Sequence, residues 1–138
     1  MKAYIMRGMP GSGKTTFAKS LGVKVCSADD FHMVDGVYLF NPMKAAQAHA
    51  WCLTQFIEAL AQRIDVCVAN TAIHLWEFSA YLAAARLAGY EIEIHEFIPK
   101  SLDELKDCCK RNVHGVPLPV MLQMWYEYEA FPVISHGQ

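Results

Sequence analysis

The stretch RGMPGSGKTTF, residues 7–17, decides the fold that this sequence predicts. Within it, Gly8 to Thr15 match the pattern G-x-x-x-x-G-K-[ST], whose backbone folds around the phosphates of a nucleoside triphosphate. The glycines let successive N–H groups converge on an anion, and the following helix adds the positive end of its dipole. Because the match is complete and lies between a strand-like and a helix-like segment, we interpret it as a phosphate-binding loop.

Each part of this loop has an expected ligand. Lys14 should reach the β- and γ-phosphate oxygens as a positive charge, and we expect it to be partly exposed. The hydroxyl of Thr15 should coordinate Mg²⁺, and Thr16 should touch the α-phosphate. The remaining nucleotide contacts expected from the loop are Gly8, Pro10, Gly11, Ser12 and Gly13. The motif predicts ATP or another nucleoside triphosphate, with Mg²⁺, but it does not name the acceptor of the phosphate.

The rest of the chain alternates between strand-like and helix-like stretches without repeats or a linker. The expected strands are 3–7, 23–27, 65–69 and 90–97, and the expected helices are 13–21, about 42–63, about 75–88, about 101–111 and one after Pro117. Asp35-Gly36 predicts the turn of a small hairpin. The apolar run 65–69 indicates an interior strand. In 90–97 apolar and polar residues alternate, which indicates a strand with one solvent-exposed face or a strand at the edge of the sheet. This order favours an α/β fold with a mostly parallel sheet of about four strands flanked by helices.

Two carboxylates, Asp29 and Asp30, follow the second expected strand. The carboxyl ends of parallel strands meet at one edge of a sheet, so both should lie at the rim that holds the phosphate loop. Phosphoryl transfer to a hydroxyl needs a carboxylate to accept its proton and oxygen ligands for the metal. We therefore favour Asp29 as general base and Mg²⁺ ligand. For Asp30, capping of the following turn is as good an interpretation as a catalytic role.

Three separated segments, GMPGSGKTTFA, SADDF and CCKRNVHGVP, together resemble the phage-type 5′-hydroxyl polynucleotide kinases and their relatives. The similarity extends from the first strand to the last helix and is closest to a compact branch of P-loop kinase-like proteins with RN-x-HGVP in the lid. It implies one domain over residues 1–138 with a three-layer P-loop kinase fold, its phosphate loop at 8–15 and a helical lid at about 101–116. It also implies that Asp29 is the base for a 5′-hydroxyl, Arg111 the arginine finger and a nucleotide contact, and His114 a second phosphate contact.

The acceptor is the least determined part of this interpretation. The resemblance points to Asp30, His32, Asn70 and Thr71 as acceptor contacts, but the chain departs from the family at two places. Relatives carry an aspartate after the third strand where this chain reads Ala-Asn-Thr-Ala, and His32 stands where the polynucleotide kinases grip the 3′-phosphate with arginine. A kinase for a small hydroxyl compound, such as a nucleoside or an antibiotic, therefore stays open. A nucleotide-binding switch is disfavoured, because a switch needs no hydroxyl base.

Composition narrows the class of protein further. The chain is 54% hydrophobic and 19% charged, with a net charge of −2 and no run of Lys or Arg, which argues against tight binding to long nucleic acid. No apolar run approaches the roughly 20 residues that span a bilayer, and the N-terminus does not resemble a signal peptide, so we expect a cytoplasmic protein. The five cysteines lack a C-x-x-C spacing and are expected to be free thiols rather than zinc ligands. The sequence does not indicate an oligomeric state.

Overall fold

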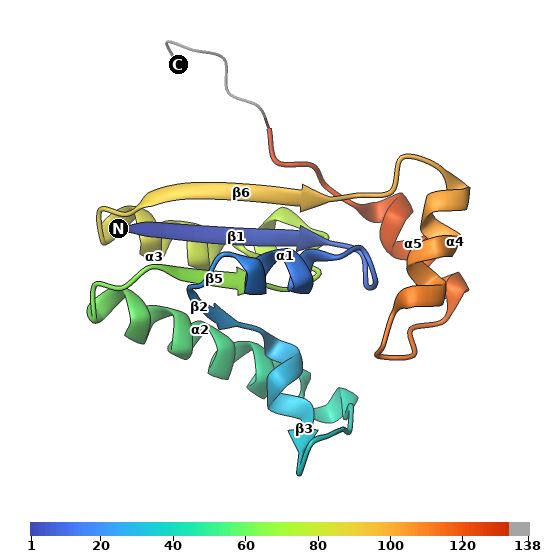
Figure 1. The fold of residues 1–138 in the computed structure, drawn as a ribbon, viewed down its shortest axis with the longest axis horizontal. Helices are drawn as coiled ribbons and strands as arrows, with labels where there is room; N and C mark the ends of the chain where they lie inside the picture. The colour runs from blue at the N-terminus through green and yellow to red at the C-terminus, as the bar shows by residue number, and fades with distance from the viewer. Residues whose placement is uncertain (133–138) are drawn as a thin grey trace.

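Four parallel strands form a central sheet with the order β2-β5-β1-β6 (Figure 1). The computed structural model describes residues 1–132, and residues 133–138 of the predicted domain lie outside this part. The strands are β1 (Lys2–Gly8), β2 (Lys24–Cys26), β5 (Val66–Ala69) and β6 (Glu91–Phe97). The predicted α/β fold with a mostly parallel sheet of about four strands is confirmed, with β5 inside the sheet and β6 at its edge, as their sequence patterns predicted.

Helices cover both faces of this sheet and give three layers. The helices are α1 (Lys14–Ser20), α2 (Ala45–Ala61), α3 (Ser79–Leu87), α4 (Leu102–Arg111) and α5 (Leu118–Glu127). Ala3 and Ile5 of β1 face the main core under α2 and α3, whereas Met6 faces a smaller core with Ala18 of α1. Successive side chains of a strand point to opposite faces, so the apolar run of β1 serves both layers.

Two smaller units flank the end of the sheet at which the strands finish (Figure 1). The helices α4 and α5 pack on each other and include the segment at about 101–116 that was predicted to be a lid; we call this unit the lid. Its core of Leu105, Cys108 and Met121 includes Met9 of the phosphate loop. On another side, β3 (Met33–Val34) and β4 (Val37–Tyr38) form the predicted hairpin. Asp35 and Gly36 have φ of 51° and 80°, the left-handed conformation that such a tight turn requires.

Element boundaries differ from the sequence predictions mainly where helices begin. The helix expected from Pro42 starts as a 3₁₀ turn over Pro42–Lys44 before α2, and the one expected from residue 75 is a 3₁₀ turn over Leu75–Glu77 followed by α3. Strand β2 is shorter than the predicted 23–27, because the chain turns at Ala28 into a 3₁₀ segment that ends at His32. These differences leave the order of elements unchanged.

Among residues 1–132, no helix is long and apolar enough to cross a membrane. All five cysteines are free thiols, as predicted, and four of them are buried. The described part of the chain contains no group of three His, Cys, Asp or Glu side chains arranged to hold a metal ion.

Candidate functional site

The phosphate loop connects β1 to α1 at the edge of the sheet formed by the carboxyl ends of the strands. Gly13 is the residue before α1 and has a φ of 93°, a left-handed conformation that glycine adopts readily. The amide of Ser12 donates to the carbonyl of Met9 at 3.2 Å, which closes the loop on itself. The hydroxyl oxygen of Ser12 is buried without a hydrogen-bond partner. A buried polar atom without a partner carries a desolvation cost, so this loop is suited to a polar ligand.

Lys14 lies deeper than its sequence position suggested. Its side chain is only 9% exposed, so the expectation of partial exposure is wrong, and its Nζ donates to the carbonyl of Met9 at 3.3 Å. Burial lowers the pKa of Lys14 to about 8, and the negative charge of Asp29 opposes this shift. The lysine is therefore a desolvated cation whose charge becomes fully favourable only when an anion joins it.

The lid packs directly on the phosphate loop. A Cβ added to Gly11 would lie 2.0 Å from the carbonyl oxygen of Cys108 in α4, so only glycine allows this approach. The Nε of Arg111, at the end of α4, donates to the carbonyl of Gly11 at 3.1 Å. The positive charge predicted to act as an arginine finger is thus held against the loop.

Asn112 shapes the segment that follows Arg111, a role that the sequence reasoning missed. Its side-chain Nδ2 donates to the carbonyls of Cys109 and Val116 at 2.8 and 3.1 Å, and its Oδ1 accepts from the amide of Val116 at 2.9 Å. These bonds close a turn over residues 112–116 and hold His114 within it. The motif RN-x-HGVP contained this asparagine, but only the hydrogen bonds reveal its purpose.

Asp29 is contacted from two directions. It lies in the 3₁₀ segment after β2, where its amide donates to the hydroxyl oxygen of Ser27 at 3.3 Å. The hydroxyl of Tyr38, from the hairpin, donates to its Oδ1 at 3.3 Å, and Nε2 of His114, from the lid, lies 3.3 Å from its Oδ2. Burial, and then the charge of Asp29, raise the pKa of Tyr38 to about 12, so its hydroxyl keeps the proton that it donates.

One cavity of about 750 Å³ brings most of the predicted site residues together. It lies between the phosphate loop, the turn after β2, the hairpin and the lid. The predicted residues that line it are Pro10, Gly11, Ser12, Gly13, Lys14, Thr15, Thr16, Asp29, His32, Asn70, Thr71, Arg111 and His114. Tyr38, Phe40 and His49 also line it, and none of these was predicted.

Two predicted residues, Gly8 and Asp30, are not among the cavity's lining residues. Gly8 is the buried last residue of β1, and its amide donates to the carbonyl of Thr71 at 3.0 Å. A Cβ there would lie 2.2 Å from the carbonyl oxygen of Phe97, so Gly8 allows β1 and β6 to run close together. Asp30 is exposed beside the rim, where it follows Asp29 in the 3₁₀ segment.

Two of the predicted acceptor residues, Asn70 and His32, are already engaged in contacts within the protein. The Oδ1 of Asn70, after β5, accepts from the amide of Ala28 at 2.9 Å and so fixes the start of the segment that carries Asp29. His32 is 5% exposed and packs its ring against Phe40. Asn70 and His32 therefore shape the wall of the cavity, whatever further contacts they make with a ligand.

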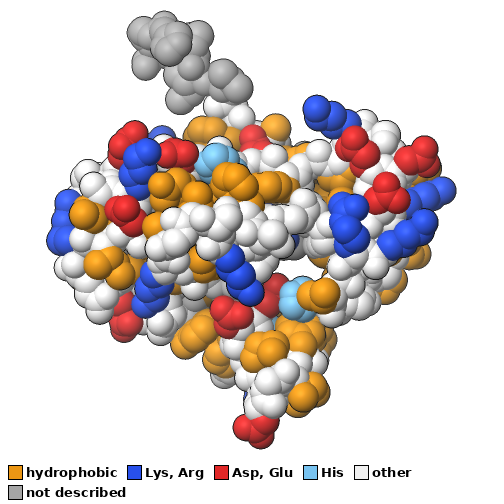
Figure 2. Space-filling view, in the orientation of Figure 1, with side chains coloured by type: hydrophobic (Ala, Val, Ile, Leu, Met, Phe, Trp, Pro, Cys, Tyr) orange, Lys and Arg blue, Asp and Glu red, His pale blue; other side chains and the backbone are white. Residues whose placement is uncertain are grey.

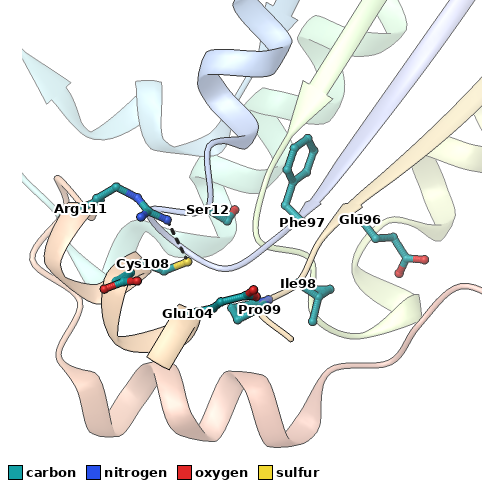
Figure 3. Close-up of a pocket in the computed structure, with 9 residues that line it drawn as sticks. Ser12, Glu96, Phe97, Ile98, Pro99, Glu104, Cys108 and Arg111 are labelled. Atoms are coloured by element: carbon teal, nitrogen blue, oxygen red, sulfur yellow. Dashed lines mark hydrogen bonds between the residues drawn. The ribbon is translucent and has the colours of Figure 1, made fainter. Parts of the chain in front are cut away.

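A second hollow, of about 290 Å³, lies on the other side of Arg111. Figure 3 shows Arg111 and Cys108 of α4 on one side of it, Ser12 above, and the segment Phe97–Pro99, which begins at the last residue of β6, on the other side. Ser12 and Arg111 line both hollows. The phosphate loop is consequently open to two adjoining spaces.

The donor set fits the predicted metal. Thr15 and Asp29 line the same cavity and present a hydroxyl and a carboxylate, the hard oxygen donors that Mg²⁺ prefers. Two protein oxygens are enough, because Mg²⁺ usually keeps several waters and takes its other ligands from substrate phosphates.

Comparisons with known proteins agree with this arrangement. A family model described as an AAA domain matches residues 4–114. Human (Homo sapiens) NEDD4-binding protein 2 is 31% identical over 140 residues, which cover 92% of this chain but only 8% of that protein.

Two solved structures share the fold. A chain in the Pnkp1/Rnl/Hen1 RNA repair complex is similar over 91% of this chain and 43% of its own length, with a TM-score of 0.73 and 22% identity. A gluconokinase from Sinorhizobium meliloti 1021 is similar over 94% of this chain and 75% of its own, with a TM-score of 0.59 and 18% identity. The chain belongs to the AAA domain family, whose model matches most of its length.

Proposed function

We propose that this protein is a kinase that transfers the γ-phosphate of ATP, or of another nucleoside triphosphate, to the 5′-hydroxyl end of a nucleic acid or nucleotide. The observation that supports it most is that one cavity is lined by Lys14 and Thr15 of the phosphate loop, by the carboxylate of Asp29 and by Arg111 of the lid. A nucleotide switch needs the first two, whereas transfer to a hydroxyl also needs the other two.

In this proposal the loop binds the triphosphate. Backbone amides from Gly11 to Thr16 and the charge of Lys14 take the phosphates, and the second hollow beside Arg111 leaves room for the rest of the nucleotide. Thr15 and Asp29 would hold Mg²⁺, which supplies charge neutralisation on the phosphate oxygens when it is bound. The buried hydroxyl of Ser12, unpartnered in the protein, gains a partner in a phosphate oxygen.

The acceptor binds at the opposite end of the cavity, next to Asp29. Its hydroxyl oxygen forms a bond to the γ-phosphorus, the bond from that phosphorus to the β–γ bridging oxygen breaks, and the hydroxyl proton passes to the Asp29 carboxylate. Arg111 compensates the negative charge that spreads over the transferred group. Tyr38 orients the carboxylate through its hydrogen bond to Oδ1, and His114 does so through its contact with Oδ2.

Segments along the whole chain, rather than one contact, favour the class of acceptor: the three that resemble the 5′-hydroxyl polynucleotide kinases support a 5′-hydroxyl end. The likeness to a chain of an RNA repair complex, at 22% identity, concerns the fold alone. The likeness to a gluconokinase concerns the fold alone at this level of identity, so it does not favour a sugar acceptor. One observation keeps a small hydroxyl compound as second candidate: Lys14 and Arg111 are the only lysine and arginine among the described residues that line the cavity.

A panel of acceptors tests the proposal. Wild-type protein is incubated with Mg²⁺ and γ-labelled ATP against 5′-hydroxyl DNA and RNA oligomers, 3′-nucleotides, nucleosides and non-nucleoside polyols. The same oligomers carrying a 5′-phosphate are the matched control, because they lack only the reacting hydroxyl. We expect label on the 5′-hydroxyl acceptors and none on the blocked ones. Label confined to polyols or other alcohols would refute the proposal.

A pair of neighbouring variants tests the assignment of the base. Asp29→Asn keeps the shape but removes the proton acceptor, so it should lower kcat by roughly a hundredfold or more while ATP still binds. Asp30→Asn is the control, because Asp30 is exposed and lies outside the cavity, and it should have little effect. The reverse order of these two effects would show that the base is Asp30.

A further inference from the structure

The end of the cavity next to Asp29 has an aromatic wall that the transfer chemistry does not use. Tyr38 and Phe40 are two positions apart on the extended chain of the hairpin, so their rings stand on the same side of it. The two rings are nearly parallel, at 15°, with centroids 6.4 Å apart. Both line the cavity, and Phe40 remains 56% exposed although it is a large apolar side chain. We call the two rings the platform: the ring of His114 lies against Tyr38, with centroids 4.2 Å apart, and Phe40 is the exposed part.

The platform is held in place from behind. The buried ring of His32 meets Tyr38 and Phe40 edge-on, with centroids 6.0 and 5.0 Å away. Phe31 lies against both His32 and Trp51 of α2, with centroids 5.8 and 6.0 Å away, so the support extends to the body of the fold. Tyr38 is fixed in addition by its bond to Asp29. The rings are therefore preorganised beside the proposed base.

Among the described residues, the elements beside Asp29 contribute no lysine or arginine to the lining of the cavity. Lys14 and Arg111, the lysine and arginine among the described lining residues, are both bonded to carbonyls of the phosphate loop, to Met9 and Gly11. The turn after β2, the hairpin segment and α2 contribute Ala28, Asp29, His32, Tyr38, Phe40, Ala45, Ala48 and His49. Lys44 precedes the lining residue Ala45 in sequence but is exposed and does not line the cavity. A 3′-phosphate on the acceptor would therefore meet no lysine or arginine from the described part of these elements.

We propose that the Tyr38–Phe40 platform stacks the base of the acceptor's terminal nucleoside, and that the protein recognises this nucleoside as an uncharged unit without a grip on its 3′-phosphate. The inference rests on the proposed function, since it places the base of a 5′-hydroxyl acceptor whose hydroxyl faces Asp29. Every base has a π-face, so stacking recognises a nucleoside without selecting its sequence. Figure 2 shows apolar side chains gathered over the hairpin region below the sheet, whose exposed members include Val37, Leu39 and Phe40.

Four acceptors distinguish the contribution of the base from that of the 3′-phosphate to recognition of the acceptor. They are adenosine, adenosine 3′-monophosphate, a 5′-hydroxyl dinucleotide and the same dinucleotide with an abasic 5′ residue, all assayed near pH 7.5, about one unit above the ordinary pKa of histidine. We expect kcat/KM for adenosine and its 3′-monophosphate to agree within about threefold, and the abasic acceptor to be roughly tenfold to a hundredfold poorer than the intact dinucleotide. A preference of tenfold or more for the 3′-phosphate, or full activity on the abasic acceptor, would overturn the inference.

Substitutions in the platform test whether Phe40 is the residue that stacks the base. Phe40→Ala should raise the KM for adenosine about tenfold and leave the KM for ATP unchanged, whereas Phe40→Tyr keeps a ring and should restore the KM. Lys44→Ala is the control for a hidden phosphate contact and should change neither acceptor. A loss of activity with the 3′-monophosphate alone in Lys44→Ala would overturn the inference, as would an unchanged KM in Phe40→Ala.

A binding measurement separates this inference from the proposed function. The fluorescence of 2-aminopurine riboside is measured with protein and a non-hydrolysable ATP analogue, where stacking quenches it. We expect quenching with wild type and Phe40→Tyr and little with Phe40→Ala. Transfer to 5′-hydroxyl acceptors without this difference would refute the stacking and leave the proposed function standing. If no 5′-hydroxyl acceptor is phosphorylated and the riboside is not quenched, the proposed function and the inference both fall.

Discussion

The imidazole Nε2 of His114 lies 3.3 Å from Oδ2 of Asp29, so the lid contacts the proposed base directly. The ring of His114 also packs on Tyr38, with centroids 4.2 Å apart, and its Nδ1 is buried without a hydrogen-bond partner. The resemblance implied a phosphate contact for this residue, whereas its contact within the protein is to a carboxylate. We infer that His114 holds Asp29 in position through this contact, since a reacting group must be kept in the geometry of the reaction.

The His114 contact predicts a kinetic difference between two substitutions. His114→Ala removes the imidazole contact and should lower kcat roughly tenfold, because the contact is to a charged carboxylate but both side chains are partly exposed to water. His114→Gln keeps a polar side chain that can contact the carboxylate and should recover much of the rate. The KM for ATP should change in neither variant. An increased KM for ATP with preserved kcat would show instead that His114 contacts the nucleotide.

Arg111 should act on the transfer step. Its guanidinium is held against the carbonyl of Gly11, beside the position of the transferred phosphate in the proposed complex. Loss of an arginine finger can cost on the order of 10³-fold in rate, so Arg111→Ala should lower kcat strongly. Lys110→Ala is the control, because Lys110 is the preceding exposed cation of the same helix. A change confined to the acceptor KM would make Arg111 a binding residue.

Much of the site could be predicted because its determinants are local or follow from strand order. The phosphate loop depends on contiguous residues, and the hairpin turn depends on Asp35-Gly36 alone. Asp29 follows β2, and in the order β2-β5-β1-β6 the ends of all four parallel strands share one edge, so its place beside the loop followed from topology. Thr71 and Asn70, after β5, lie on the same edge for the same reason.

The parts that sequence could not supply depend on side chains that meet across the fold. Nothing near Lys14 in the sequence shows that the lid core reaches Met9 and leaves the lysine nearly buried. The D-G turn predicted a hairpin but not that Tyr38 would donate to Asp29. Arg7 is the largest omission: the sequence showed a charged residue at the end of a strand, whereas its guanidinium is completely buried.

Arg7 should be essential for stability. Its guanidinium lies over the rings of Phe78 and Tyr128, 4.3 and 4.6 Å from their centroids, and bonds the carbonyl of Ala72 at 2.9 and 2.7 Å. It also lies 3.1 Å from Oε2 of Glu96. Arg7→Met leaves these acceptors without their donor, so the free energy of unfolding should fall by about 3–5 kcal/mol.

Two further variants show whether the burial of Arg7 causes this loss. Arg7→Lys keeps the charge but lacks the planar fork, so it should also be strongly destabilising. Lys2, on β1 like Arg7, forms an exposed pair with Glu93 of β6 at 3.0 Å, so Lys2→Met should change stability little. Urea denaturation monitored by circular dichroism measures all three. Equal effects of Arg7→Met and Lys2→Met would show that burial of the Arg7 pair does not matter.

Lys14 should oppose stability while it supports activity. Burial lowers its pKa to about 8 in the folded protein from its ordinary value of 10.5, so the folded state binds its proton less readily than the unfolded state. The protein therefore has its full stability above the pKa that Lys14 has in the unfolded chain, and it loses stability as the pH falls through the pKa that Lys14 has in the folded protein. At neutral pH the wild type therefore carries a buried charge that costs free energy, and Lys14→Met should remove that cost together with the activity.

The comparison of two pH values isolates this effect. One pKa unit corresponds to about 1.4 kcal/mol. Between about pH 7 and 9.5, the free energy of unfolding of wild type should therefore rise by about 2 kcal/mol relative to that of Lys14→Met. Other titrating groups are common to both proteins and cancel in the difference. Saturating ATP and Mg²⁺ should stabilise wild type far more than the variant, since the phosphates pair with the lysine. If the difference between the two proteins does not change with pH, Lys14 is not desolvated in the folded protein, and its charge needs no phosphate to be stable there.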